Sequence, residues 1–219
     1  MGAFDVERTA GPFGATVSGL DLRQPLDPAT ASQLREVWLD QQVLVFPEQD
    51  LGFADLELLA EAFGPIGKDP YFRPIPGQGH VVALTREADE TTPLFADVWH
   101  SDWSFLASPP AATLLYGVDI PPRGGDTLFA NQYAAHDGLP DDLRERIAGL
   151  VGIHSARRGY SKQGQYGDRD VGRSIDIVAS DDAMATQRHP LIRLHPESGR
   201  PALFCSLAYT IGIEGMDDD

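Results

Sequence analysis

The sequence contains a single cysteine, Cys205, in 219 residues. One thiol cannot form an internal disulfide, and it cannot supply a zinc or iron–sulfur site built from several cysteines. Basic residues are also scarce, since 17 Lys and Arg stand against 33 Asp and Glu, a formal net charge of -16. Such an acidic surface repels phosphate backbones and anionic lipids, so neither nucleic acid nor a membrane is an expected partner.

Long apolar runs are missing as well. No stretch approaches the ~20 apolar residues that span a bilayer, and the N-terminus lacks the basic and apolar regions of a secretory signal. Hydrophobic residues nevertheless make up 42% of the chain, which is enough to bury a sizeable core. We therefore expect one globular domain over residues 1–219, soluble and cytoplasmic.

Helix signals are concentrated near the N-terminus. Asp27 suits an N-cap and Pro28 the first helical turn, and apolar residues then recur at helical spacing, which predicts a helix over 28–41. A second amphipathic helix is predicted over 53–63, and the apolar run 43–46 between them predicts a buried strand.

The remainder alternates short apolar runs with Pro- and Gly-rich loops. This pattern favours a mainly β fold with flanking helices, of the antiparallel sandwich or jelly-roll type. The segments concerned are a helix over 140–149, a helical turn over 181–187, and strands over 81–85, 112–118, 150–154, 191–194 and 202–205.

The segment 97–105 contains a candidate metal-binding pattern, His100-Ser101-Asp102. Residues i and i+2 of a strand point to the same face, so an imidazole nitrogen and a carboxylate oxygen could hold one metal ion. A second His from elsewhere would complete a facial triad suited to Fe(II). Taken alone, the pattern equally fits a partly exposed His beside an N-capping Asp. His195-Pro196-Glu197 is a second match, but it lies in a predicted turn.

The order of the motifs is more specific than any one of them. After His-x-Asp come a predicted strand, the segment Pro-Pro-Arg-Gly-Gly-Asp-Thr-Leu-Phe-Ala-Asn over 121–131, and Arg-His-Pro-Leu-Ile-Arg-Leu-His-Pro-Glu-Ser-Gly-Arg over 188–200. In this order the sequence resembles the TauD/TfdA family, the taurine-dioxygenase-like Fe(II)/2-oxoglutarate-dependent oxygenases. Segments 14–22 and 43–49 are also similar to the opening segments of that family, so the resemblance spans nearly the whole chain.

The resemblance implies a double-stranded β-helix (jelly roll) that holds iron. By position, it makes His100 and Asp102 iron ligands and Thr127 a contact of the 2-oxoglutarate co-substrate, with no catalytic residue beyond the iron ligands. It also implies that dioxygen and 2-oxoglutarate are used to hydroxylate a small organic substrate, with succinate as co-product. The resemblance leaves a homo-oligomer open.

The sequence departs from the family pattern in its C-terminal part. The third iron ligand of the family, a His, and the Arg that pairs with 2-oxoglutarate have no counterpart here. His189 and His195 occupy positions that belong to the strand scaffold of the family. We expect the closing strands, with that His and Arg, to lie beyond Asp219. The alternative is a catalytically incomplete, non-enzymatic binding or assembly protein on the same scaffold.

The substrate is expected to be small and anionic. Tyr71, Trp103 and Tyr209 are candidate walls of its pocket by position, although each equally fits an ordinary aromatic core. Taurine dioxygenases place a His close to Tyr71, so taurine itself is not the expected substrate. A basic cluster over 157–162 could steer an anion towards the site, or it could be a solvated loop.

Overall fold

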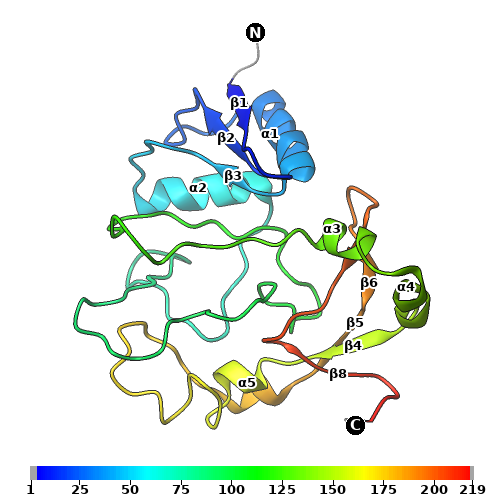
Figure 1. The fold of residues 1–219 in the computed structure, drawn as a ribbon. Coiled ribbons are helices and arrows are strands. Elements are labelled where there is room, and N and C mark those ends of the chain that lie inside the picture. The colour runs from blue at the N-terminus through cyan, green and yellow to red at the C-terminus, as the bar shows by residue number, and fades with distance from the viewer. Residues whose placement is uncertain (1–3, 218–219) are drawn as a thin grey trace. The chain divides into compact units, whose positions relative to one another are not determined.

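The computed structural model describes residues 4–217 (Figure 1). This part of the chain forms two compact units. The first comprises residues 4–68, 76–81 and 111–127, and the second comprises 69–75, 82–110 and 128–217. Each unit is therefore assembled from segments that are distant in the sequence. The longest helix has 14 residues, and none of the helices in the described part of the chain could cross a membrane.

The first unit combines a small mixed sheet with two helices. Strand β2 lies between the other two strands, pairing antiparallel with β1 and parallel with β3. The elements are β1 (Asp5–Arg8), β2 (Ala15–Ser18), α1 (Pro28–Gln41), β3 (Leu44–Val45) and α2 (Phe53–Phe63).

Helix α1 begins where the sequence predicts it. The Asp27 carboxylate accepts hydrogen bonds from the backbone N–H groups of Ala29 and Thr30, at 3.0 and 3.1 Å, which satisfies two otherwise unpaired helix donors. Trp38 of α1 packs edge-on against Phe63 of α2, with ring centroids 5.5 Å apart. Both predicted helices are thus confirmed. The strand between them is present as its two central residues, but it is not buried as predicted: Val45 is 51% exposed, because β3 is an edge strand of its sheet.

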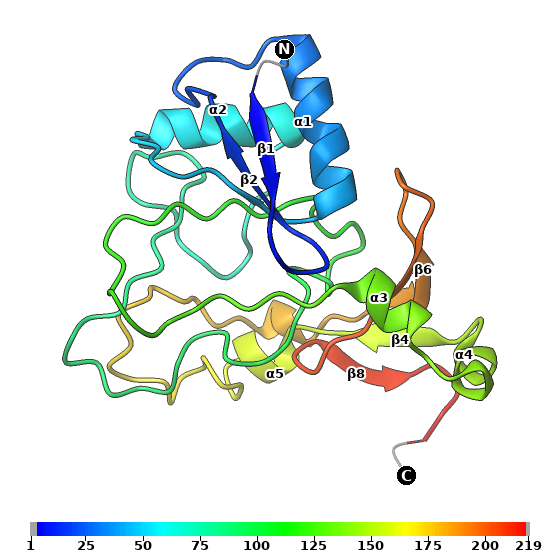
Figure 2. The same cartoon turned by 45° about the horizontal axis from the view of Figure 1, so that its top comes forward.

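The second unit is built around a three-stranded antiparallel sheet with β4 in the centre and β5 and β8 at its edges. A separate hairpin pairs β6 with β7. Figure 2 shows β4 and β8 side by side. The elements are α3 (Gln132–Asp137), α4 (Asp141–Ile147), β4 (Val151–His154), α5 (Arg157–Tyr160), the 3-10 turn η1 (Asp181–Met184), β5 (Gln187–Pro190), β6 (Ile192–Leu194), β7 (Pro201–Leu203) and β8 (Thr210–Ile213).

Short strands with flanking helices agree with the coarse part of the predicted fold class, and the jelly roll itself stays a prediction. The strands expected at 150–154, 191–194 and 202–205 are present as β4, β6 and β7. Those expected at 81–85 and 112–118 are not, because the described chain contains no helix or strand between α2 and α3. An apolar run becomes a strand only where a neighbouring strand pairs with it. No β-ladder among the described residues includes either segment.

The core of the second unit is aromatic. Tyr71 stacks on Tyr160 with ring centroids 4.5 Å apart and planes 4° from parallel. Phe105 packs edge-on against Tyr209 at 4.9 Å, and Tyr166 also belongs to the buried cluster. These rings come from both sides of the His-x-Asp segment in the sequence, so they fix the surroundings of the candidate site.

Candidate metal centre

The His-x-Asp segment forms a turn in the second unit. His100 Nε2 lies 3.1 Å from Asp102 Oδ1, and the two side chains are 27% and 42% exposed. The expectation that a strand would align them is wrong. The backbone N–H of Ser104 instead donates to the carbonyl of Ser101 at 3.2 Å, so the chain folds back directly after the pair. The turn, rather than strand alternation, brings the two side chains together.

Hydrogen bonding fixes which nitrogen of His100 faces the carboxylate. Nδ1 lies 2.8 Å from the carbonyl oxygen of Val98, which can only accept, so Nδ1 is the nitrogen that carries hydrogen. Nε2 is then left to face Asp102. The Asp102 carboxylate raises the pKa of His100 by its hydrogen bond, against the opposing effect of burial. Nitrogen and oxygen can therefore share either a proton or a cation.

The separation of these two atoms suits a metal ion. Adjacent ligands of an octahedral ion, each at about 2.1 Å, lie about 3 Å apart. The Nδ1 contact to a backbone carbonyl is the usual way in which a metal-binding His is oriented. Within residues 4–217, however, no group of three or more His, Cys, Asp or Glu side chains is placed to hold an ion. The described residues therefore fit two of the three ligands of a facial triad.

Trp103, directly after Asp102, has an unusual backbone conformation. Its φ of 48° lies in the left-handed region, which costs a non-glycine residue roughly 1–2 kcal/mol. Its indole N–H donates to Asp69 Oδ2 at 2.9 Å. The other oxygen of Asp69 accepts the backbone N–H groups of Tyr71 and Phe72, at 2.7 and 2.9 Å. Burial raises the pKa of the Asp69 carboxyl, and the nearby Asp102 charge adds to that effect.

Sequence reasoning missed Asp69. The dipeptide Asp69-Pro70 is typical of a turn, and the aspartate does form one with the N–H groups that follow it. Its second role depends on an indole 34 positions further along the chain. No local pattern in a single sequence indicates such a contact.

The structure brings the predicted pocket residues together in the second unit. Tyr209 lies edge-on to the His100 ring with centroids 5.9 Å apart. Tyr71 and Tyr209 are only 5% and 7% exposed, and burial raises the pKa of both phenols. Trp103 is half-buried against the same cluster. All three are thus members of the aromatic core or packed on it, and their contact with substrate stays a prediction.

The other predicted groups are placed differently. Thr127 is exposed and belongs to the first unit, so its role towards 2-oxoglutarate stays a prediction. In the basic cluster, Arg158 donates to the carbonyls of Leu207 and Thr210, both at 3.0 Å. Lys162 pairs with Asp181 at 2.6 Å. Arg158 and Lys162 thus have structural partners, and steering of an anion by the cluster stays a prediction.

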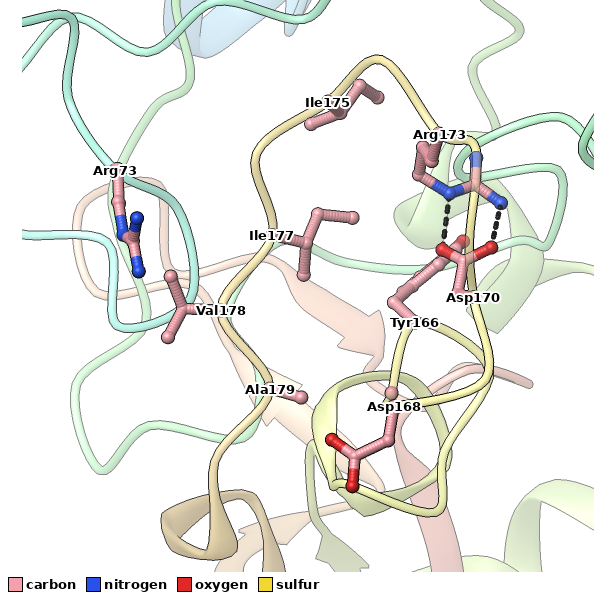
Figure 3. A pocket seen from close by; sticks show the side chains of 10 residues that line it. Arg73, Tyr166, Asp168, Asp170, Arg173, Ile175, Ile177, Val178 and Ala179 are labelled. Atoms are coloured by element: carbon pink, nitrogen blue, oxygen red, sulfur yellow. Dashed lines mark hydrogen bonds and ion pairs between the residues drawn. The ribbon is translucent and has the colours of Figure 1, made fainter. Parts of the chain in front are cut away.

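A pocket of about 360 Å³ lies between the two arms of the loop over 166–179 (Figure 3). Ile175 and Ile177 line one side, and Arg173 holds both carboxylate oxygens of Asp170 on the other, at 2.6 and 3.3 Å. None of the predicted site residues is among those that line it. Of the buried aromatic cluster, Tyr166 lines the pocket, and neither His100 nor Asp102 does.

The turn and its surroundings define a candidate mononuclear metal centre of the His/carboxylate type. The sequence matches the family described as "Taurine catabolism dioxygenase TauD, TfdA family" over residues 5–219, and the chain belongs to that family. The resemblance noted from the order of the motifs is thus confirmed.

Individual relatives agree with this assignment. The chain is 31% identical to an alkylsulfatase of Acinetobacter baylyi over 90% of its length, and spans 61% of that protein. It is 32% identical to an alpha-ketoglutarate-dependent 2,4-dichlorophenoxyacetate dioxygenase of Cupriavidus pinatubonensis, over 93% of this chain and 73% of the relative. The crystal structure of a taurine dioxygenase from Burkholderia xenovorans aligns with a TM-score of 0.74 and 27% identity, covering 99% of this chain and 69% of that one.

Proposed function

We propose that the protein is an Fe(II)/2-oxoglutarate-dependent dioxygenase that hydroxylates a small organic molecule. The balanced reaction converts 2-oxoglutarate, dioxygen and a substrate C–H group into succinate, carbon dioxide and a C–OH group. The observation that supports this most directly is the 3.1 Å approach of His100 Nε2 to Asp102 Oδ1, at the His-x-Asp position of a dioxygenase family.

In this proposal His100 and Asp102 hold the iron, and Thr127 contacts the distal carboxylate of 2-oxoglutarate. Bound iron would supply the redox chemistry by which dioxygen is used. The Val98 carbonyl accepts a hydrogen bond from Nδ1–H of His100, which leaves the lone pair of Nε2 available to the metal beside Asp102. Tyr209 and Trp103 would exclude water from the metal-facing side of the turn.

The third iron ligand and the Arg that pairs with 2-oxoglutarate remain to be assigned. Within residues 4–217 the turn offers two ligands of a facial triad, and the chain spans 61% of the alkylsulfatase relative.

The named relatives support a proposal for the substrate class. An alkylsulfatase and a 2,4-dichlorophenoxyacetate dioxygenase act on compounds that carry an anionic group, as does a taurine dioxygenase. We therefore propose a small organic anion. Tyr71 stands near the position where taurine dioxygenases have a His, so a sulfate ester or a carboxylate is favoured over taurine.

The second candidate is a non-enzymatic binding or assembly protein on the same scaffold. It is favoured by the two-ligand set at the turn, since two ligands hold a metal weakly. The two candidates differ in one measurable property, which is whether succinate forms in a manner that depends on His100 and Asp102.

The test is release of succinate from 2-oxoglutarate with Fe(II), dioxygen and a panel of alkyl sulfates, aryloxy acids and sulfonates. We expect turnover in the wild type and background turnover in His100→Ala and Asp102→Ala. His80→Ala and Asp119→Ala are matched controls, because both residues are exposed and neither belongs to the proposed site. Turnover that survives loss of either ligand contradicts the proposed site. A folded wild type without turnover supports the binding protein instead.

A further inference from the structure

We infer that Asp69 is a positioning residue that acts through Trp103 to hold the turn bearing His100 and Asp102 in a metal-binding geometry. This inference rests on the proposed metal function of the turn. It adds a residue from a distant part of the sequence, joined to the site by one hydrogen bond of 2.9 Å.

The turn needs an external support because its backbone is strained at both ends. Ala96 has a φ of 56° and Trp103 a φ of 48°, and neither residue is a glycine. Non-glycine residues rarely adopt this region, and a bulky side chain is the least suited to it. The free segment would therefore relax to other conformations, in which His100 and Asp102 need not approach each other.

Each strained end is tied to the core of the second unit. The backbone N–H of Ala96 donates to the phenol oxygen of Tyr166 at 3.1 Å. The indole N–H of Trp103 donates to Asp69. Tyr166 is buried in the aromatic cluster, so the first anchor is fixed by packing.

The second anchor, Asp69, is fixed by hydrogen bonds. Besides the indole it accepts the N–H groups of Tyr71 and Phe72. The carbonyl of Tyr71 accepts the backbone N–H of Val178 at 2.8 Å, which ties this segment to the loop over 166–179. With both oxygens engaged by three donors, the Asp69 carboxylate is positioned to hold Trp103 rather than to become a third metal ligand.

Trp103 transmits this support to the metal site because it directly follows Asp102. A change in φ of Trp103 reorients the peptide between them and with it the direction of the Asp102 carboxylate. The 3.1 Å separation between His100 Nε2 and Asp102 Oδ1 is therefore expected to depend on the Asp69 bond. In other metal sites, loss of a hydrogen-bond partner of a ligand weakens metal binding by about 10–100-fold, and we expect the Asp69 bond, made to the residue beside a ligand, to act at the lower end of that range.

The bond itself can be observed without metal. The chain has three tryptophans, so ¹⁵N-labelled indoles give three N–H signals in the NMR spectrum. We expect Asp69→Asn to shift the Trp103 signal and to speed its exchange with water, leaving those of Trp38 and Trp99 in place. A Trp103 signal that is unchanged in Asp69→Asn overturns the inference.

The consequence is measured as the affinity for Mn(II), by water-proton relaxation, with His100→Ala as the baseline for binding elsewhere. We expect Trp103→Phe and Asp69→Asn each to weaken the His100-dependent binding by about 10-fold or more. In Asp69→Asn the single amide oxygen is needed by the N–H groups of Tyr71 and Phe72, so the amide NH2 faces the indole and cannot accept from it. The double variant should therefore be no weaker than the worse single one, because both changes remove the same bond. Tyr133→Phe is the matched control, since it deletes a 3.1 Å hydrogen bond to Ser198 elsewhere in the second unit.

A second pair of variants separates positioning from packing. Trp103→Gly removes more of the side chain than Trp103→Ala, but glycine adopts a positive φ without strain and alanine does not. If backbone conformation is what matters, the glycine variant retains more Mn(II) affinity than the alanine variant. Equal or better binding by the alanine variant contradicts the inference.

Failure of the inference is distinguishable from failure of the proposed function. Without any His100-dependent Mn(II) binding in the wild type, the proposed function fails and the positioning role falls with it. If the His100-dependent Mn(II) affinity of Trp103→Phe and Asp69→Asn stays within twofold of the wild-type value, the metal site stands and only the positioning role is overturned.

Discussion

His154 shows how a single buried side chain makes stability depend on pH. It is 1% exposed, its Nδ1 lies 3.0 Å from the hydroxyl of Ser104, and its Nε2 is buried without a hydrogen-bond partner among the described residues. Its ring stacks on Phe204 at 5.5 Å and meets His189 edge-on at 5.2 Å. Burial lowers the pKa of His154 to about 4, and the charges of His189 and Arg193 act in the same direction.

This low pKa predicts loss of stability in mild acid. The unfolded chain takes up the His154 proton near pH 6.5 and the folded chain only near pH 4, so protonation favours unfolding as the pH falls between these values. Between pH 7 and 5 the wild type should lose roughly 2 kcal/mol more unfolding free energy than His154→Gln. Urea titrations at a series of pH values measure this difference, and parallel curves would contradict it.

At the residue scale, the sequence indicated the pair His100 and Asp102, whose metal role stays a prediction, but not the contacts that support the pair. His100 and Asp102 are recognisable because they are two positions apart within a larger motif order. Asp69 and Ser104 act through contacts with residues 34 and 50 positions away. Periodicity and turn preferences describe neighbours along the chain, so contacts across the fold are invisible to them.

At the scale of elements, the start of α1 allows the contribution of a helix cap to thermal stability to be measured. One carboxylate oxygen of Asp27 accepts hydrogen bonds from two N–H groups of the first turn. Pro28 has no backbone N–H, so it needs no acceptor there. We expect Asp27→Ala to lower the Tm by about 2–4 °C, because those donors lose their partner. Asp27→Ser should lower the Tm by less, because a serine hydroxyl can also accept hydrogen bonds from these N–H groups.

The measurement is thermal unfolding followed by circular dichroism. Asp119→Ala is the matched control, because Asp119 is an exposed aspartate of the same unit that caps no helix in the described part of the chain. A Tm that falls equally in the cap variant and in this control would show that lost charge, not the lost cap, is responsible.

Helices were predicted more accurately than strands, for a physical reason. α1 and α2 have their own signals, such as Asp27 before Pro28, because a helix satisfies its hydrogen bonds internally. A strand depends on a partner, so segment 112–118 has an apolar pattern but is not paired in the described residues. Conversely β5, with the sequence Gln-Arg-His-Pro, has little strand signal and is paired all the same with β4.

At the scale of the whole molecule, charge is the dominant feature. Exposed ion pairs such as Arg8–Asp40 and Arg188–Glu214 contribute little stability. With a formal net charge of -16, repulsion among carboxylates outweighs them and favours expansion.

Screening should therefore stabilise the fold. We expect the Tm to rise as NaCl increases from about 20 to 500 mM, because the Debye length shrinks from roughly 20 Å to under 5 Å. Scanning fluorimetry at pH 7 measures the effect, and the same series in KCl separates screening from sodium binding. A Tm that is constant or falls with salt would contradict the prediction.

For the molecule as a whole, the family and the fold class were the properties that the sequence predicted best. Several weak motifs in a fixed order identified the family, which the match over residues 5–219 confirms. The division of the chain into two compact units had no sequence signal, because each unit draws on segments that are far apart along the chain. The single domain over residues 1–219 stays a prediction.

The two left-handed residues that bracket the turn around His100 and Asp102, Ala96 and Trp103, also limit how the motif can be reused. A protein engineer who transplanted residues 96–105 into another scaffold would transfer both His100 and Asp102. The carboxylate of Asp69 and the phenol of Tyr166, which hold the ends of that turn, would be left behind. A graft that is meant to keep the conformation of the turn is therefore expected to need these two distant side chains as well.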